Sequence, residues 1–274
     1  MIESLMNLLN EQDKFNLEKI TGYGFDEISS KIIKSKLNFL NNEKHIASDL
    51  DAYGLHVIRC LLADKIDKQK RNNLISTTDS NYFDFINKGI VVLPNKDFND
   101  DYVQKLLKMC LITNNLKFTN SRAVDSYASY DIQYGLHVDT FHMAIKAFQY
   151  KNDVGKANGP FSYVISSNVI DDKKMKFLYD VSNKRSKNIS LGLKKQDDHE
   201  KWTPSFRMGL KTYTEKGIEK NLKKYGYDKE TLIEAKSGTL IIADVSGLHR
   251  KFPCEKNYVR ITNRWSFNRD NPFK

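Results

Sequence analysis

The sequence predicts an α+β protein that is mainly β, with helices in its first quarter and an antiparallel β core after them. Residues 1 to about 75 repeat apolar side chains at helical spacing, as in Leu55, Ile58 and Leu61. From about residue 127, short apolar runs alternate with turn signals such as Asn-Gly-Pro at 158–160. Many short strands without alternating helices favour an antiparallel sandwich or barrel.

The first elements follow in chain order. Polar residues 77–80 separate the helical part from Gly89–Pro94, a β-branched run that predicts a buried strand. A helix with an acidic first turn is expected over 102–109. We therefore divide the chain into an N-terminal helical extension, residues 1–78, packed on a core domain, residues 79–274.

The second half of the chain carries most of the predicted strands. They are expected at 135–139, 144–150, 162–166, 206–213, 238–243 and 258–267. Residues 173–199 are polar and Lys-rich and predict a long loop, with a lid over the open end of the core as the functional alternative for 173–195. Residues 214–234 predict a helical segment that interrupts the strands.

Composition excludes several classes of protein. The chain has 274 residues, 40% of them hydrophobic, which is enough for a packed core and too much for a disordered chain. No apolar run approaches the roughly 18 residues of a membrane span, so we expect a cytoplasmic protein without a membrane partner. The formal net charge is +10, but Lys is spread along the chain, and we do not expect a nucleic-acid partner. The three cysteines are far apart and predict reduced thiols.

Three side chains form the candidate metal site. In His137-Val138-Asp139 an imidazole and a carboxylate lie two residues apart, so on a strand both point to one face. Residues 238–249 predict a strand that ends in a turn and in His249, 110 residues beyond Asp139. Two histidines and one carboxylate on one face of an iron ion leave three positions open, as in the facial triad of non-haem Fe(II) oxygenases.

An arginine that could bind a carboxylate follows these three residues along the chain. Arg260 follows His249 by 11 residues, and its planar guanidinium suits the far carboxylate of 2-oxoglutarate. Thr262 shares its strand face and can add a hydroxyl hydrogen bond. Arg264 shares the face too, and either forms a salt bridge at the rim or holds an anionic group of the substrate. Lys146 either faces solvent or assists 2-oxoglutarate.

Other polar residues near the motif are less specific. Tyr130 and Gln133 precede the His-x-Asp pair and either line the pocket or merely cover it. His142 lies three residues after Asp139, which on a strand is the opposite face, so we do not expect it to be a ligand. The remaining histidines lack partners at a useful spacing and are expected at the surface: His45, His56 and His199.

The order of these motifs resembles a known family. The series His137-x-Asp139, Asn-Gly-Pro at 158–160, Gly-Thr-Leu-Ile-Ile-Ala-Asp at 238–244, His249 and Arg260 resembles the phytanoyl-CoA dioxygenase-like branch of the Fe(II)/2-oxoglutarate-dependent dioxygenases. The segment 85–94 is similar to the strand that opens that family's domain, and the resemblance covers about residues 80 to 268.

The resemblance implies a double-stranded β-helix, also called a jelly roll or cupin-like fold, with Fe(II) at its open end. It implies that His137, Asp139 and His249 bind the iron and that Arg260 holds the C5 carboxylate of 2-oxoglutarate. O2 would then take the remaining iron position. The implied reaction is hydroxylation of a small-molecule substrate, an anionic one if Arg264 binds it, with formation of succinate and CO2.

Two alternatives remain open at this stage. An oxygenase that acts on a nucleic acid or a protein would have a continuous basic track leading to the iron. A jelly-roll binding protein without catalytic activity would form no succinate when iron and 2-oxoglutarate are supplied.

Overall fold

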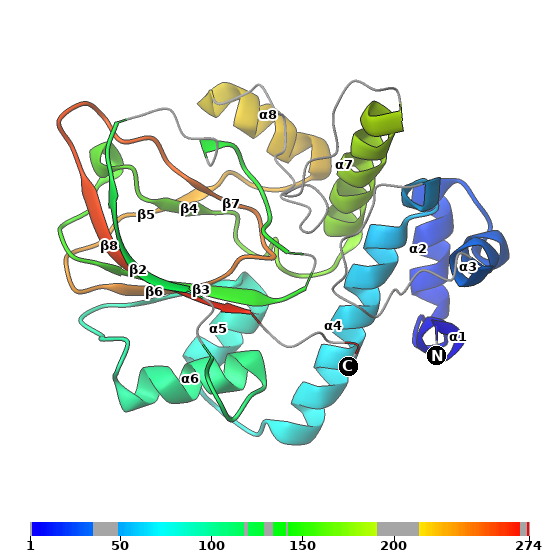
Figure 1. Ribbon diagram of the computed structural model, residues 1–274, viewed down its shortest axis with the longest axis horizontal. Coiled ribbons are helices and arrows are strands. Elements are labelled where there is room, and N and C mark those ends of the chain that lie inside the picture. Colours follow the sequence, from blue (N-terminus) through cyan, green and yellow to red (C-terminus); the bar gives the residue numbers. More distant parts are fainter. Residues whose placement is uncertain are drawn as a thin grey trace.

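The computed structural model describes residues 2–34, 49–117, 120–128, 134–140, 142–190, 214–268 and 273. Figure 1 shows its helices, which are α1 (Ile2–Met6), α2 (Glu11–Thr21), α3 (Phe25–Lys34), η1 (Asp49–Asp51), α4 (Leu55–Leu74), α5 (Ser80–Lys88), α6 (Asp101–Leu111), η3 (Lys156–Asn158), α7 (Asp172–Ser190) and α8 (Glu215–Tyr225). Its strands are β1 (Ile90–Leu93), β2 (Asn120–Ser126), β3 (Ala144–Tyr150), β4 (Phe161–Tyr163), β5 (Thr231–Ile233), β6 (Leu240–Asp244), β7 (His249–Lys251) and β8 (Arg260–Asn268).

These strands form two antiparallel sheets. One has five strands in the order β1-β6-β3-β8-β2, and the other has three in the order β5-β4-β7. An apolar cluster joins them, with Ile241 and Ala243 of the larger sheet packed against Phe161 and Tyr163 of the smaller one. Figure 1 shows the smaller sheet above the larger one. The predicted combination of helices with antiparallel sheets is confirmed.

The central strand β3 shows why its sequence forms a buried strand with two different faces. Ile145 and Ala147 belong to the apolar cluster on the outer face of the larger sheet. Lys146 and Phe148 alternate with them and line a pocket on the inner face. The period of two therefore places the outer apolar layer on one side of the sheet and the pocket lining on the other.

Two helices cover the outer face of the larger sheet. Helix α5 begins after Asp79, whose carboxylate accepts hydrogen bonds from two backbone N–H groups, and it ends at Gly89 in the left-handed conformation. Helix α6 confirms the helix predicted over 102–109. The segment that resembles an opening strand is shorter than expected, because Phe85–Lys88 is the last turn of α5 and the strand begins at Ile90.

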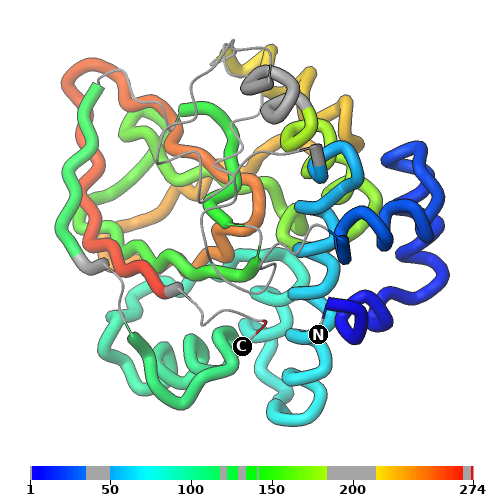
Figure 2. The backbone as a smooth tube through the Cα atoms, turned by 45° about the vertical axis from the view of Figure 1, so that its right-hand side comes forward, coloured from blue at the N-terminus to red at the C-terminus, as the bar shows by residue number. Residues whose placement is uncertain are grey.

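The other α-helices pack at one end of the sheets. Helices α2, α4, α7 and α8 share an apolar cluster, which also includes Leu136, Val138 and Leu248 next to the candidate ligands. Figure 2, turned by 45° from Figure 1, shows this helical layer beside the sheets. The loop predicted for 173–199 is wrong up to Ser190, because Met175, Phe177 and Leu178 are buried on one side of α7. Residues 191–199 lie outside the described residues.

Several other predictions need correction or lie outside the described residues. Residues 135–139 form no strand, and their one ladder contact is an isolated bridge at His137. Strand β2 was not predicted, because it lies just before residue 127, where the series of short strands was expected to begin. His56 was expected at the surface but is buried, with 5% exposure, and lies close to Asp51. The strand predicted at 206–213 lies outside the described residues. Among the described helices, none is both long and apolar enough to cross a membrane.

Candidate metal centre

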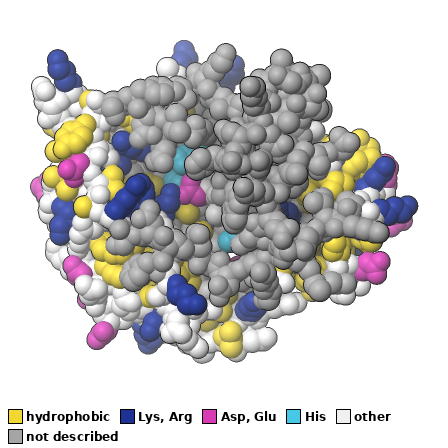
Figure 3. Space-filling model, viewed as in Figure 1, with side chains coloured by type: hydrophobic (Ala, Val, Ile, Leu, Met, Phe, Trp, Pro, Cys, Tyr) yellow, Lys and Arg dark blue, Asp and Glu magenta, His cyan; other side chains and the backbone are white. Residues whose placement is uncertain are grey.

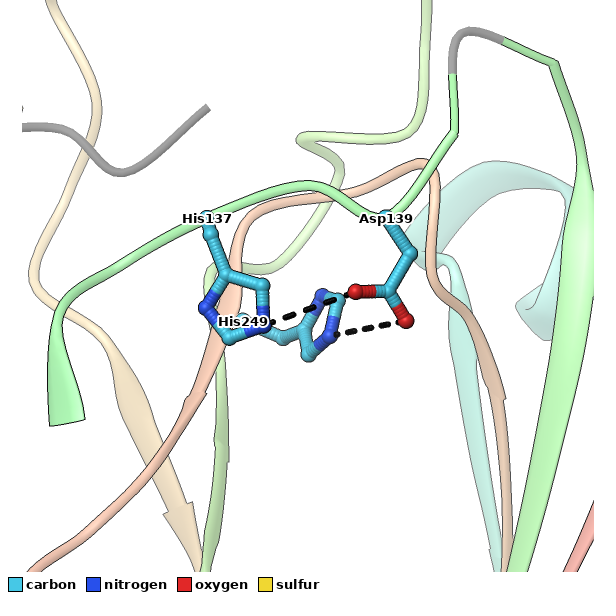
Figure 4. A group of neighbouring side chains, drawn as sticks. All are labelled: His137, Asp139 and His249. Carbon is cyan, nitrogen blue, oxygen red and sulfur yellow. Dashed lines mark ion pairs between the residues drawn. The ribbon is translucent and has the colours of Figure 1, made fainter. Parts of the chain in front are cut away.

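The two predicted histidine ligands face each other across the backbone. His137 and His249 form an isolated antiparallel bridge, in which each N–H donates to the other's carbonyl oxygen at 3.0 and 2.9 Å. The N–H of Asp139 donates to the carbonyl oxygen of Val245 at 2.8 Å, which fixes the carboxylate beside the turn before β7. Ligand atoms of the three residues lie within 4.8 Å of one another. Figure 4 shows both imidazoles turned toward the Asp139 carboxylate.

Backbone carbonyl oxygens set the tautomer of both imidazoles. The Nδ1 atom of His137 lies 2.8 Å from the carbonyl oxygen of Gly135, and that of His249 lies 3.0 Å from the carbonyl oxygen of Gly247. A carbonyl oxygen can only accept, so Nδ1 carries the proton and Nε2 keeps its lone pair. The two Nε2 atoms lie 3.5 and 3.7 Å from carboxylate oxygens of Asp139. Both histidines therefore present the atom that a metal would bind.

The charge states of the three residues suit a metal ion. Burial and the neighbouring His137 lower the pKa of His249 to about 3, so its imidazole is neutral at neutral pH. Burial would raise the pKa of Asp139, but His249, the Lys146 ammonium and His137 together hold it below its ordinary value. Lys146 forms an ion pair with the Asp139 carboxylate. The set thus offers two imidazole Nε2 atoms, that of His249 on a neutral ring, and one carboxylate.

One buried atom tests whether a metal fits here. Nε2 of His249 is buried and has no hydrogen-bond partner, although a buried polar nitrogen ordinarily has one. A divalent cation between the two Nε2 atoms and the carboxylate would satisfy that nitrogen. The residues therefore fit a metal ion bound by two histidines and one aspartate.

Arg260 begins strand β8 on the pocket side of the larger sheet. Its side chain is 9% exposed, it donates to the carbonyl oxygen of Gly159, and its buried Nε has no partner. Gly159 has a φ of +67°, and a Cβ there would overlap the Phe252 backbone. The Asn-Gly-Pro turn noted in the sequence thus brings a carbonyl oxygen to the arginine. Thr262, two residues along, donates to the carbonyl oxygen of Val124 at 3.3 Å.

A pocket of about 240 Å³ connects these groups. Its lining combines residues of the inner sheet faces with the candidate ligands: Arg122, Val124, Asp125, Ser126, His137, Lys146, Phe148, Phe161, His249, Arg250, Lys251, Arg260, Thr262 and Arg264. Figure 3 shows histidine, basic and acidic side chains close together on this face of the molecule. The structure therefore brings the histidines, Arg260, Thr262, Arg264 and Lys146 to one cavity.

The structure does not bring every named residue to the site. Tyr130 and Gln133 lie outside the described residues. His142 does not belong to the three-residue group, and its Nδ1 lies 3.0 Å from the carbonyl oxygen of Met143. Lys146 does not simply face solvent, because its ammonium contacts Asp139.

Sequence reasoning missed two arginines that line the pocket. Arg250 directly follows His249, is 1% exposed, and pairs with the Glu230 carboxylate. Arg122 lies on β2, directly opposite Arg264 of β8. Residues 120–126 read Asn-Ser-Arg-Ala-Val-Asp-Ser, without alternation of polar and apolar residues, so the sequence carries no clear signal for β2 or for its partner strand.

Comparisons with known proteins give no family assignment. No family model and no curated protein matches the chain. Among solved structures, apo HygX from Streptomyces hygroscopicus has 11% identity and a TM-score of 0.41, over 72% of this chain and 88% of that chain. The epimerase SnoN in complex with Fe3+, alpha ketoglutarate and nogalamycin RO has 10% identity and a TM-score of 0.41, over 69% and 82%. Likeness at this level does not establish a family for this chain.

Proposed function

We propose that this protein is a non-haem Fe(II)- and 2-oxoglutarate-dependent dioxygenase that hydroxylates a small molecule. The observation that carries the proposal is the convergence of His137, Asp139 and His249 within 4.8 Å at the edge of a pocket. Three protein ligands on one side of a metal leave the other side open for the co-substrate and for O2. A ferrous ion bound there would couple O2 activation to the conversion of 2-oxoglutarate into succinate and CO2.

Other residues of the pocket would bind 2-oxoglutarate and exclude water. Arg260 would bind the C5 carboxylate of 2-oxoglutarate, since its guanidinium is buried and its Nε lacks a partner. Thr262 would add a hydroxyl hydrogen bond from the same strand face by turning its proton from the Val124 carbonyl oxygen to the carboxylate. The rings of Phe148 and Phe161, with centroids 4.9 Å apart, form an apolar wall that excludes water from the reacting groups.

The fold and the domain division belong to the same proposal. We propose that the two sheets are the halves of a double-stranded β-helix, of the phytanoyl-CoA dioxygenase-like branch, over residues 79–274. The order of the motifs along the chain and the facing antiparallel sheets support this. Residues 1–78 would be a helical extension that packs on this core through the cluster shared with α7 and α8.

A small-molecule substrate agrees better with the pocket than a macromolecule does. The pocket volume of about 240 Å³ lies just below the roughly 300–1,000 Å³ of ordinary small-ligand sites, and residues of both sheets line it. The same cavity is lined by the two candidate histidine ligands and by Arg260. The substrate must therefore present its reacting carbon inside a narrow space.

The decisive experiment is anaerobic addition of Fe(II) and then 2-oxoglutarate to the full chain. We expect the weak visible charge-transfer band of the iron chelate in the wild type, and its loss in His249→Ala. His142→Ala is the matched control, because that histidine is also buried nearby but lies outside the three-residue group. No band in the wild type, or a band of full strength in His249→Ala, would overturn the proposal.

A further inference from the structure

Two arginines face each other across the pocket-lining strands. Arg122 of β2 and Arg264 of β8 are direct partners in the antiparallel register, and both line the pocket that contains His137 and His249. Side chains directly opposite on antiparallel strands are close neighbours, and like charges in such a pair destabilise the sheet. The pairing therefore costs stability unless something of opposite charge lies between the two guanidinium groups.

The described residues supply no ion-pair partner for either arginine. None of the ion pairs among them includes Arg122 or Arg264, and the buried Nε of Arg264 has no hydrogen-bond partner. Asp125, an acidic residue of the lining, accepts a hydrogen bond from Tyr127 at 3.4 Å instead. The pair differs in this respect from Arg250, whose charge is balanced by Glu230.

The position of Arg264 relates the pair to the candidate metal centre. Burial and the charge of Arg122 lower the pKa of Arg264, while the Asp139 carboxylate opposes them. Arg260 is deeper in the fold and is influenced by Tyr150 and Cys254 rather than by Asp139. The two arginines of β8 thus have different surroundings. The carboxylate of the candidate ligand Asp139 acts electrostatically on Arg264 and not on Arg260.

We propose that Arg122 and Arg264 form a subsite for an oxyanion, a phosphate or carboxylate group carried by the hydroxylated substrate. The guanidinium fork binds both groups bidentately, and two such forks side by side suit a doubly charged group. This inference deepens the proposed function, on which its link to hydroxylation rests. If Arg260 holds 2-oxoglutarate, the oxyanion at Arg122 and Arg264 belongs to the second substrate, which is then an anionic small molecule.

The test uses the metal-free full chain, so that the subsite is measured without the iron centre. Inorganic phosphate and acetate are titrated separately by calorimetry into the wild type and into Arg122→Gln, Arg264→Gln and Arg260→Gln. We expect one of the two anions to bind the wild type, with affinity at least tenfold weaker in Arg122→Gln and in Arg264→Gln. The anion that binds more tightly identifies which group the substrate carries.

The controls separate this inference from the proposed function. Lys223→Gln removes an equal charge from an exposed site on α8 and should leave anion binding unchanged. Absence of binding, or a loss of binding in Arg260→Gln alone, would overturn the subsite. The iron and 2-oxoglutarate band is recorded on the same variants. A wild type without that band that still binds the anion through Arg122 and Arg264 would refute the oxygenase and retain the subsite.

Discussion

His137 and His249 are backbone partners in an isolated antiparallel bridge, although 112 positions separate them in the chain. Opposite residues of such a bridge project their side chains to the same side. The ring centroids accordingly lie 4.5 Å apart, and both Nε2 atoms face Asp139. The geometry of the candidate metal centre is therefore fixed by main-chain hydrogen bonds before any metal binds.

Metal addition should stabilise the folded chain through this preformed site. At a metal concentration of 100 times Kd, linkage adds about 2.7 kcal/mol to the free energy of unfolding. For a chain of this size that corresponds to a rise in Tm of roughly 5–10 °C. We expect Mn(II) to produce such a rise in a thermal melt and EDTA to reverse it. His249→Ala should show no rise, whereas an equal rise in that variant would contradict the ligand assignment.

Arg260→Ala should weaken 2-oxoglutarate binding and leave iron binding in place. Loss of a charged hydrogen-bond pair costs about 1.5–3 kcal/mol, which corresponds to a Kd roughly 10- to 100-fold higher. The measurement is a titration of the anaerobic Fe(II) protein with 2-oxoglutarate, followed by the charge-transfer band. Arg260→Lys keeps the charge but not the planar guanidinium fork, and its Kd for 2-oxoglutarate should lie between those of the wild type and Arg260→Ala. If Arg264→Ala weakened 2-oxoglutarate binding instead, the roles of the two arginines would be exchanged.

Gly247→Ala should destabilise the fold at the turn before β7. A Cβ at this position would overlap the Tyr163 side chain, whose Oη donates to the carbonyl oxygen of Asp244 at 2.8 Å. Overpacking of a buried site costs about 1–3 kcal/mol, measurable by urea unfolding. Gly24→Ala is the matched control, because a Cβ at that position would have no other atom within 4 Å. Equal stability of the two variants would show that the turn is not tightly packed.

Lys174 should make stability depend on pH in an unusual direction. Its ammonium is buried, donates to the carbonyl oxygen of Ser246, and burial lowers its pKa to about 8. Below pH 8 the lysine is charged in both the folded and the unfolded chain, and the full cost of burying the charge is present. Between pH 8 and about 10.5 the folded chain releases its proton first, so this contribution to stability rises with pH.

A comparison with Lys174→Met isolates that effect. The free energy of unfolding of the wild type, relative to Lys174→Met, should rise by an amount on the order of 3 kcal/mol between pH 7 and pH 10.5. Urea unfolding at several pH values measures the difference. A difference that stayed constant, or that fell as the pH rose, would show that the ammonium is not buried as described.

The strands that the sequence predicted correctly share a strong local signal. Strand β3 has the predicted bounds, and β6 and β8 lie within two residues of theirs. Strands β3 and β6 are mainly apolar runs between turns, and β8 alternates polar residues with Ile261, Trp265 and Phe267. The spacing of Arg260, Thr262 and Arg264 on one face follows from the same period of two. Local patterns were sufficient there because the residues of each strand are themselves enough to predict which of its faces is buried.

The errors come from information that is not local. Helix α7 was predicted as a loop because it is rich in Lys. Its buried side nevertheless has apolar residues at helical spacing, Met175, Leu178 and Val181. The segment that carries His137 and Asp139 forms no strand, and its position depends on β7 and on the turn at Val245. Arg122 gives no sign in the sequence that it lies opposite Arg264, since strand pairing is a tertiary property.

The apolar cluster of the N-terminal helices has one more consequence. Leu136, Val138 and Leu248 alternate with the candidate ligands and belong to the apolar cluster that the first helices share with α7 and α8, so these helices together support the candidate metal centre from behind. A shortened chain that began at residue 79 would lose the side chains that α1 to α4 contribute to this cluster and would expose part of what remains to water. We expect it to aggregate or to lose its affinity for metal, so that the part of the chain with the candidate ligands would not be stable as an independent fragment.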